Sequence, residues 1–304
     1  MACFNPVPAC RYEDGSVRMV SGRKGEAGSF LLPCGRCQGC RLESSRQWAV
    51  RCVHEASLWP KNSFVTLTYS PEHLPPGGSL HYRDFQLFIK RLRKSETVYG
   101  KRDGRRIVVS RPTIRFFMCG EYGETYGRAH YHALLFNYRP EDLVPINKTL
   151  FDSPKLAKLW RHGAVTVGDV TWQSASYVAR YIFDKLNGEL GRDKYAVSVD
   201  DDGVITFRDS EFCQMSRRPG IGAGWFERFH RELWASDSVV IDGREQKIPK
   251  FYDKRMRKQR EVDFAEIVAN REFRASLQAS DNTPRRLADK AAVLNARLSL
   301  SNKR

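Results

Sequence analysis

Two apolar segments joined by a polar loop limit the folds open to this chain more than any other feature. The segments are TIRFFMCG (113–120) and HYHALLFN (130–137), and the loop EYGETYGRA between them carries two glycines. Segments so rich in β-branched and aromatic residues predict two neighbouring strands that pair as a hairpin with a long loop. We therefore expect antiparallel sheet in this part of the chain.

A His-x-His pair stands at the start of the second segment. Side chains alternate between the two faces of a strand, so His130 and His132 share one face, as ligands of a divalent metal would. A third ligand is expected from Glu121, nine positions before His130 at the end of the partner strand, with Glu124 in the loop as the reserve candidate. Alternatively, both histidines are ordinary strand residues. Their face is otherwise apolar, however, and imidazoles there need a partner such as a metal.

A helix predicted at 174–186 presents two tyrosines away from its apolar stripe. At about 100° per residue the stripe is centred opposite Tyr177, and Tyr181 lies only about 40° from Tyr177. A metal facing a tyrosine suggests covalent phosphodiester chemistry, in which the phenol oxygen attacks phosphorus. Arg180 and Lys185 flank the tyrosines and are the candidate cations that favour the phenolate. In the ordinary alternative, the tyrosines fill core gaps or cover the surface.

The composition is that of a folded protein that meets nucleic acid. The 304 residues, 41% of them hydrophobic, suffice for a full core, and 51 Lys and Arg against 35 Asp and Glu give a net charge of +16. This balance is typical of proteins that bind phosphate backbones, with membrane surfaces as the rival partner. The sequence has no apolar run long enough to span a membrane and no apolar segment typical of a signal peptide at its start. We therefore expect a soluble, intracellular protein without a membrane partner.

The remaining pattern predicts three parts with mixed helices and strands. These are a cysteine-containing segment with a helix (1–60), a central domain (61–235) and a basic, mainly helical tail (236–304) without an evident core. Further elements are expected as helices at 41–58, 82–95 (a basic surface helix) and 154–161, strands at 64–69 and 164–170, and a hairpin around Asp202-Gly203.

Eight unevenly spaced cysteines are typical of a protein whose thiols stay reduced. Cys34, Cys37 and Cys40 form a C-x2-C-x2-C cluster with the spacing of a shared structural zinc ion, which prefers four ligands. The fourth is expected among Cys3, Cys10, Cys52 and His54. A turn with reduced thiols is the competing interpretation, because the sequence has no second tight cysteine pair.

Two further segments suit contact with DNA. In SRRPGIGAGW (216–225), Arg217 and Arg218 among glycines suit phosphate contact, and Trp225 suits stacking on an unpaired base. The alternative is a glycine-rich turn capped by a core tryptophan. The basic stretch 250–260 is expected to add nonspecific DNA affinity unless it is only a solvated face.

Five motifs in a fixed order carry a resemblance to a known family. The chain resembles the rolling-circle replication initiators of gokushoviruses, single-stranded DNA phages of the Microviridae, which belong to the HUH (His-hydrophobic-His) endonucleases. The motifs are PCGRCQGCRLESSRQWAVRCVHEA (33–56), FVTLTYSPEHLP (64–75), FFMCGEYGETYGRAHYHALLFN (116–137), YVARYIFDK (177–185) and MSRRPGIGAGW (215–225).

The resemblance implies a fold, an activity and the residues that carry it. The fold would be α+β, an antiparallel sheet with flanking helices similar to the RNA-recognition motif. The activity would be that of a Mg²⁺- or Mn²⁺-dependent nickase and strand transferase, which cuts the plus-strand origin, stays joined to the 5′ phosphate through tyrosine and leaves a 3′ hydroxyl. His130 and His132 match the metal motif, and Tyr177 and Tyr181 match the paired nucleophiles. Many initiators place a lysine three residues after a tyrosine, whereas here Lys185 comes one residue later, which leaves the cationic helper open.

The partners implied by the resemblance are single-stranded origin DNA and, in the host bacterial cytoplasm, a polymerase, a helicase and a single-strand-binding protein. The sequence has no Walker-type phosphate loop, so unwinding would need a separate helicase. The rival from another class is a noncatalytic, zinc-stabilised nucleic-acid-binding protein. It would bind DNA with steep salt dependence but never cut it.

Overall fold

The computed structural model describes residues 3–12, 16–19, 29–103, 105–123, 126–180, 196–199 and 205–301. The chain divides into two compact units. The first unit comprises Met1–Gln47, Trp234–Val240 and Glu245–Arg304, and the second comprises Trp48–Leu233 and Ile241–Arg244. The divisions fall inside α1 (Gln38–Ala56), α6 (Ala223–Ser236) and a short hairpin of β15 (Ser238–Ile241) and β16 (Arg244–Lys247).

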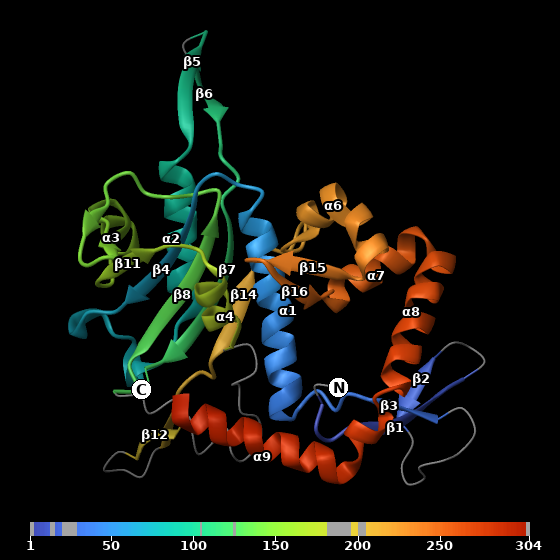
Figure 1. The fold of residues 1–304 in the computed structure, drawn as a ribbon. Coiled ribbons are helices and arrows are strands. Elements are labelled where there is room, and N and C mark those ends of the chain that lie inside the picture. Colours follow the sequence, from blue (N-terminus) through green and yellow to red (C-terminus); the bar gives the residue numbers. More distant parts are fainter. Residues whose placement is uncertain are drawn as a thin grey trace. The chain divides into compact units, whose positions relative to one another are not determined.

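A seven-stranded sheet is the framework of the second unit (Figure 1). Its strand order is β14-β7-β8-β4-β11-β10-β9, and each neighbouring pair is antiparallel. The hairpin predicted from 113–120 and 130–137 is confirmed as β7 and β8, and β8 also pairs with β4. The strands are β4 (Asn62–Thr68), β7 (Arg115–Tyr122), β8 (Ala129–Phe136), β9 (Val144–Pro145), β10 (Phe151–Asp152), β11 (Val165–Gly168) and β14 (Phe212–Met215).

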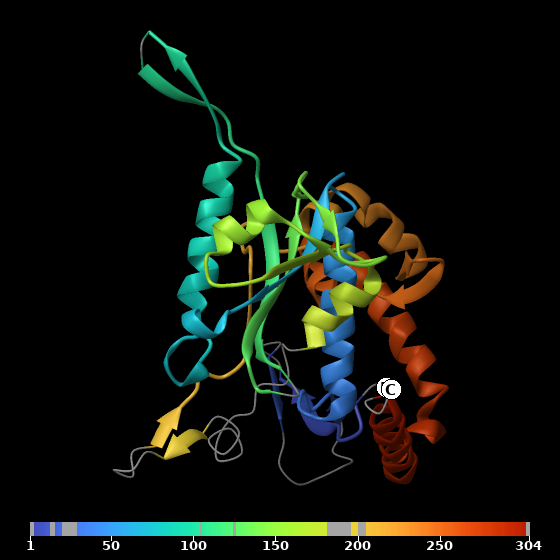
Figure 2. The same ribbon diagram turned by 90° about the vertical axis from the view of Figure 1, so that its left-hand side faces the viewer.

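Helices cover both faces of this sheet (Figure 2). One face packs on α2 (Tyr82–Ser95) and α3 (Pro154–Trp160), with Val65, Ala133 and Trp160 in the shared core. The opposite face packs on α1 and α4 (Trp172–Arg180), with Leu134 and Val178 in a second core cluster. An α+β fold of antiparallel sheet and flanking helices is therefore confirmed.

The sequence predicts α2 with its observed bounds, but its description as a basic surface helix needs correction. The helix buries Phe85, Phe88, Ile89 and Leu92, which follow the spacing of one helical face. Two of its cations also turn inward, to backbone oxygens. Arg91 donates to the carbonyls of Leu159 and Trp160, and Arg93 donates to that of Ile114. The helix is thus a packed layer of the fold with a basic outer edge.

Smaller elements complete the second unit. The hairpin predicted around Asp202-Gly203 is confirmed by the pairing of β12 (Ala196–Val199) with β13 (Ile205–Phe207). A second ribbon, to which the sequence analysis assigned no element, consists of β5 (Val98–Arg102) and β6 (Arg105–Ser110). Two 3-10 turns lie at Pro71–His73 and Pro76–Gly78.

The first unit combines a small sheet with helices. The sheet has the order β2-β1-β3, from β1 (Val7–Arg11), β2 (Val17–Met19) and β3 (Ser29–Leu32), and it precedes α1. The tail forms α7 (Lys250–Gln259), α8 (Glu261–Ser276), a 3-10 turn (Ala279–Asn282) and α9 (Pro284–Ser301). The expectation that the tail lacks a core is wrong, because Tyr252, Met256, Phe264 and Leu287 are buried. None of the described helices is long and apolar enough to cross a membrane.

Candidate active site

Glu121, His130 and His132 meet on one face of the central strands. The β7–β8 register places Glu121 directly opposite His130 and Cys119 opposite His132. Oε1 of Glu121 lies 2.8 Å from Nε2 of His130 and 3.0 Å from Nε2 of His132. The proximity expected from the hairpin is therefore present, and it follows from cross-strand pairing because opposed side chains in an antiparallel sheet lie on the same face.

The far side of each imidazole is held by a second partner. Nδ1 of His130 donates to the carbonyl of Arg128 at 2.9 Å, since a carbonyl can only accept. In the neutral ring this leaves the lone pair of Nε2 directed at Glu121. Nδ1 of His132 lies 2.9 Å from Oγ1 of Thr66 on β4. Contacts of this kind fix the orientation of histidines that bind metals.

Burial and charge together keep Glu121 ionised. Burial alone would raise its pKa, but hydrogen bonds from His130 and His132 and their positive charge outweigh burial and lower the pKa of Glu121 to about 2. Burial would lower the pKa of His130, yet its bond to Glu121 raises that pKa overall. For His132 burial prevails and the pKa is lowered. The site thus offers one carboxylate and two imidazoles in forms close to those that bind a cation.

The three side chains fit a divalent metal ion. One ligand atom from each lies within 4.8 Å of the others. Oε2 of Glu121 is buried and has no hydrogen-bond partner among the described residues, which is costly for an ionised carboxylate unless a cation or water binds there. A mixed nitrogen and oxygen set with open positions suits a catalytic divalent ion.

Tyr177 reaches this cluster from α4. Thr171 and Ser174 exchange hydrogen bonds between side chain and backbone N–H at the start of the helix, which fixes its first turn. Ala175, Val178 and Ala179 of the predicted stripe are fully buried. The half-buried Tyr177 instead directs its hydroxyl to Oε1 of Glu121 at 3.0 Å, and Nε2 of His132 is 3.4 Å away. The Tyr177 and His132 rings meet edge to face.

The other predicted members of the site are not brought into it. Arg180 is exposed at the end of α4, and no hydrogen bond or ion pair reported for the described residues joins it to Tyr177. Tyr181, Lys185 and the reserve ligand Glu124 lie outside the described residues. Of the predicted catalytic and metal residues, the described site therefore contains Glu121, His130, His132 and Tyr177.

Four cysteines gather in the first unit. The sulfur atoms of Cys3, Cys34, Cys37 and Cys40 all lie within 4.8 Å of one another. Sγ of Cys34 is 4.0 Å from Sγ of Cys40, and Sγ of Cys37 is 3.9 Å from Sγ of Cys3. A tetrahedron with zinc–sulfur bonds of about 2.3 Å has sulfur–sulfur edges of about 3.8 Å. The cluster is therefore compatible with a bound metal.

Backbone N–H groups already support these sulfurs. Phe4 N donates to Cys37, Cys34 N to Cys3 and Cys37 N to Cys34, at 3.2 to 3.3 Å. Burial favours the neutral thiol, but hydrogen bonds from Phe4, Cys40 and Cys34 outweigh it and lower the pKa of Cys37 to about 6. Among the candidates for a fourth ligand, Cys3 is the one that joins the cluster.

The segment 216–225 is anchored by buried charge. The carboxylate of Glu55 binds Nε of Arg115 at 2.6 Å and the backbone N–H of Gly222 at 2.8 Å, and Arg115 also donates to the carbonyl of Pro219 at 2.7 Å. Arg217 and Arg218 are exposed. The ring of Trp225 stacks on His54, with centroids 3.6 Å apart. Contact of these three residues with DNA stays a prediction.

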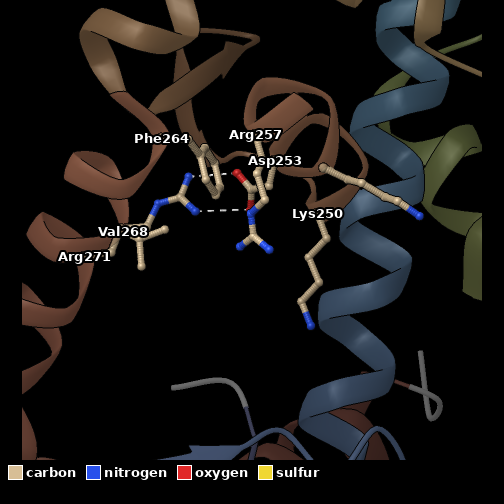
Figure 3. Close-up of a pocket in the computed structure, with 7 residues that line it drawn as sticks. Lys250, Asp253, Arg257, Phe264, Val268 and Arg271 are labelled. Atoms are coloured by element: carbon tan, nitrogen blue, oxygen red, sulfur yellow. Dashed lines mark hydrogen bonds and ion pairs between the residues drawn. The ribbon is translucent and has the colours of Figure 1, made fainter. Parts of the chain in front are cut away.

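A hollow of about 430 Å³ lies in the first unit between α7 and α8 (Figure 3). Arg271 of α8 points to Asp253 of α7 and also binds Asp237, so its charge is balanced. The lining has no cysteine, histidine or tyrosine that could act as nucleophile or base. It is formed by Lys250, Asp253, Lys254, Arg257, Phe264, Val268 and Arg271.

Comparison with known proteins identifies relatives of the whole chain. Replication-associated protein VP4 of Bdellovibrio phage phiMH2K is 33% identical over 262 residues, which cover 83% of this chain and 76% of the relative. The chain belongs to the family of phage replication-associated proteins. This confirms the family-level resemblance to replication proteins of Microviridae-type phages.

Other members of the family extend this finding. Replication-associated protein ORF2 of Spiroplasma virus 4 is 31% identical, over 87% of this chain and 83% of the relative. Replication-associated protein ORF4 of Chlamydia phage 1 is 30% identical, over 76% of this chain but only 54% of the relative. The family model described as replication-associated protein ORF2 matches residues 62–186, the stretch that contains all four residues of the site. No solved structure gives a match.

Sequence reasoning missed the groups that orient the histidines. Thr66 lies within the predicted strand 64–69, and its side chain faces the histidines because β4 pairs with β8 at Thr66–His132. The alternation of Phe64, Thr66 and Thr68 with buried Val65 and Leu67 was a signal for this face. The contact of His130 with the backbone of Arg128 carries no side-chain signal.

Proposed function

We propose that this protein is a metal-dependent single-stranded DNA endonuclease and strand transferase that starts phage rolling-circle replication by nicking the plus-strand origin. The observation that carries the proposal is the approach of the Tyr177 hydroxyl to Glu121 and His132. A tyrosine poised beside a prospective metal site is the arrangement that covalent phosphodiester cleavage requires. The fold would then be of the HUH type, similar to the RNA-recognition motif.

In the proposed reaction Tyr177 is the nucleophile. Its hydroxyl proton faces Oε1 of Glu121, with Nε2 of His132 also within reach, so these atoms can hold the proton as the oxygen attacks. The bond from Oη to phosphorus forms while the bond from phosphorus to the 3′ oxygen breaks. The leaving oxygen takes up a proton and becomes a free 3′ hydroxyl, and the 5′ phosphate stays on the tyrosine.

Glu121, His130 and His132 would hold the metal ion, proposed as Mg²⁺ or Mn²⁺. When bound, the ion would polarise the scissile phosphate and neutralise charge that develops on its oxygens. Thr66 and the carbonyl of Arg128 keep the two imidazole rings turned toward that position. Burial of the cluster limits the access of water, which would otherwise compete with the phenol for phosphorus.

Tyr181 is proposed as the second nucleophile. It follows Tyr177 by four positions, so one turn of helix would separate them. Two tyrosines near one metal would allow a second transfer, in which the new 5′ end is captured before the first is rejoined. Lys185 and Arg180 are the proposed cations that favour phenolate formation.

The proposal also gives the protein its setting. The 3′ hydroxyl would prime a host polymerase, with a host helicase and single-strand-binding protein opening the duplex in the bacterial cytoplasm. Residues 61–235 would be the nuclease domain, preceded by the cysteine-containing segment (1–60) and followed by the basic tail (236–304). Arg217, Arg218 and Trp225 remain proposed DNA contacts.

A covalent-adduct assay tests the activity. The protein is incubated with labelled single-stranded origin DNA and Mg²⁺ or Mn²⁺, and adducts that survive denaturation are separated on a gel. We expect adduct with the wild-type protein, none with EDTA, and none when Tyr177→Phe is combined with Tyr181→Phe. If the double variant still forms adduct, the assigned nucleophiles are wrong. If the wild-type protein binds DNA but never forms adduct, the noncatalytic alternative holds.

We further propose that Cys3, Cys34, Cys37 and Cys40 hold a structural Zn²⁺. The sulfur–sulfur distances and the N–H groups that donate to sulfur support a site with four thiolates. Elemental analysis of the purified protein should give about one zinc per chain. Cys3→Ser should lose the zinc, whereas Cys10→Ser, outside the cluster, should retain it. Retention of full zinc by Cys3→Ser would exclude the site.

A further inference from the structure

The ribbon of β5 and β6 is exposed along its whole length. It links α2 to β7, and Figures 1 and 2 both show it extending away from the sheet. All its described residues except Gly100 are exposed. An isolated two-stranded ribbon is marginally stable in water. Exposed apolar side chains are therefore unusual on it, and they are Val98, Tyr99, Ile107, Val108 and Val109.

The outer half of the ribbon concentrates positive charge. Lys101 lies opposite Arg106, and Arg102 lies opposite Arg105, so two pairs of like charges face each other across the strands. Asp103 is the single acidic residue of 98–110. Like charges placed directly opposite destabilise a ribbon. In the described part of the chain, no ion pair or hydrogen bond is reported for the side chains of Lys101, Arg102 and Arg105, so their repulsion is not relieved within the chain.

The two charged pairs lie on opposite faces of the ribbon. Successive side chains of a strand alternate between faces, so Lys101 and Arg106 share one face and Arg102 and Arg105 the other. The guanidinium of Arg106 lies over the ring of Tyr99, 3.8 Å from its centroid. A ribbon with cations on both faces is complementary to a groove with phosphates on both walls. The major groove of DNA is about 12 Å wide and admits a two-stranded β-ribbon.

We propose that the β5–β6 ribbon is an arm that inserts into the major groove of duplex DNA next to the nicking site. The inference rests on the proposed function, because it assigns the duplex part of an origin to the arm and the single-stranded part to Tyr177. The four cations contact the phosphate walls of the groove. The apolar side chains nearer the base of the arm lie against base edges, where the thymine methyl group is an apolar contact.

The geometry of β7 gives the spacing between the two contacts. The arm joins β7 just before Arg115, and Glu121 lies six residues further along that strand. At about 3.4 Å per residue this separates the base of the arm from the active site by about 20 Å. DNA advances about 3.4 Å per base pair, so protection by the arm should begin roughly six or more base pairs from the nick.

The test compares two sets of four substitutions that remove equal charge. The arm variant is Lys101→Ala, Arg102→Ala, Arg105→Ala and Arg106→Ala. The control is Lys90→Ala, Lys94→Ala, Lys148→Ala and Lys158→Ala, at exposed positions elsewhere in the same unit. Binding of a fluorescent duplex of roughly 30 base pairs is measured across a salt series. Thermal unfolding of each variant establishes that its fold is retained.

We expect the arm variant to lose roughly 10-fold or more in duplex affinity and to reduce the slope of log K against log salt by about 3 to 4. The control set should change the slope by less than about 1. A third variant with Arg102→Lys, Arg105→Lys and Arg106→Lys keeps the charge and should keep the slope. Wild-type affinity and slope in the arm variant would overturn the proposal, and so would an equal loss in the control.

Adduct formation on a single-stranded oligonucleotide separates this inference from the proposed function. The arm variant should form adduct at the wild-type rate, because the arm contacts duplex only. If the wild-type protein forms no adduct but the arm variant loses duplex binding, the arm is supported and the nuclease is not. If the arm variant loses adduct formation on the single strand, the division of labour proposed for the arm is wrong.

Discussion

The hydroxyl of Tyr177 donates a 3.0 Å hydrogen bond to Oε1 of Glu121, the oxygen that also lies 2.8 Å from Nε2 of His130. One carboxylate oxygen is thus shared by the prospective nucleophile and a prospective metal ligand. Its other oxygen, Oε2, is buried and has no partner among the residues that the structure describes. A cation at this position would satisfy that oxygen and bring positive charge beside the phenol.

Glu121→Gln should weaken binding of Mn²⁺ by roughly 10- to 100-fold or more, because a neutral amide replaces the ionised ligand. The dissociation constant is measured by calorimetric titration of the metal-free protein. Glu124→Gln is the matched control, since Glu124 was the reserve candidate for the same role. If Glu124→Gln weakens Mn²⁺ binding and Glu121→Gln does not, the ligand assignment must be exchanged.

Thr66→Val should weaken Mn²⁺ binding by roughly 10- to 100-fold, because it removes the hydroxyl that orients His132 while it preserves the shape of the side chain. Thr68→Val provides the comparison. Thr68 lies opposite His130 on the same strand, and no hydrogen bond of its side chain is reported. Equal effects of both substitutions would mean that strand packing, and not the contact with His132, is responsible.

Arg115→Met should lower the free energy of unfolding by about 3–5 kcal/mol, because it leaves the carboxylate of Glu55 buried without its cation. Urea titration measures the change. The exposed ion pair of Lys61 and Glu141 is the control, and Lys61→Met should cost less than about 1 kcal/mol. A loss below about 1 kcal/mol for Arg115→Met would show that the buried pair does not hold segment 216–225 in place.

His54 should make the protein less stable as the pH falls. Burial disfavours the charged imidazolium and lowers the pKa of His54 to about 3, well below the value of about 6.5 in an unfolded chain. The unfolded chain therefore binds the proton first, and stability is lost as the pH falls from 6.5 toward 3. The loss between pH 6.5 and 5 should be about 1–2 kcal/mol.

Thermal or urea unfolding at several pH values measures this dependence in His54→Phe, which retains an aromatic ring against Trp225. The variant should show a flatter pH profile than the wild-type protein. His73→Gln, at an exposed histidine, should keep the wild-type profile. An unchanged profile in His54→Phe would place the titrating group elsewhere.

The sequence predicts local elements best where hydrophobic spacing and turn chemistry agree. The bounds of α2 and the proximity of Glu121 to the histidines follow from such local patterns. Cys3 could only be one candidate among several, because its approach to Cys34 depends on the fold of the first unit. The β5–β6 arm was missed although Asp103-Gly104 is a typical hairpin pair, because its strands lack the alternation of a half-buried sheet.

The most direct test of the central claim is to identify the residue that carries DNA. The adduct formed with single-stranded origin DNA and Mn²⁺ is digested with protease and nuclease, and the modified peptide is sequenced by mass spectrometry. We predict a nucleotide joined through phosphate to Tyr177, or to Tyr181 when Tyr177→Phe is used. Attachment to a residue outside this pair, with both tyrosines unmodified, would contradict the account.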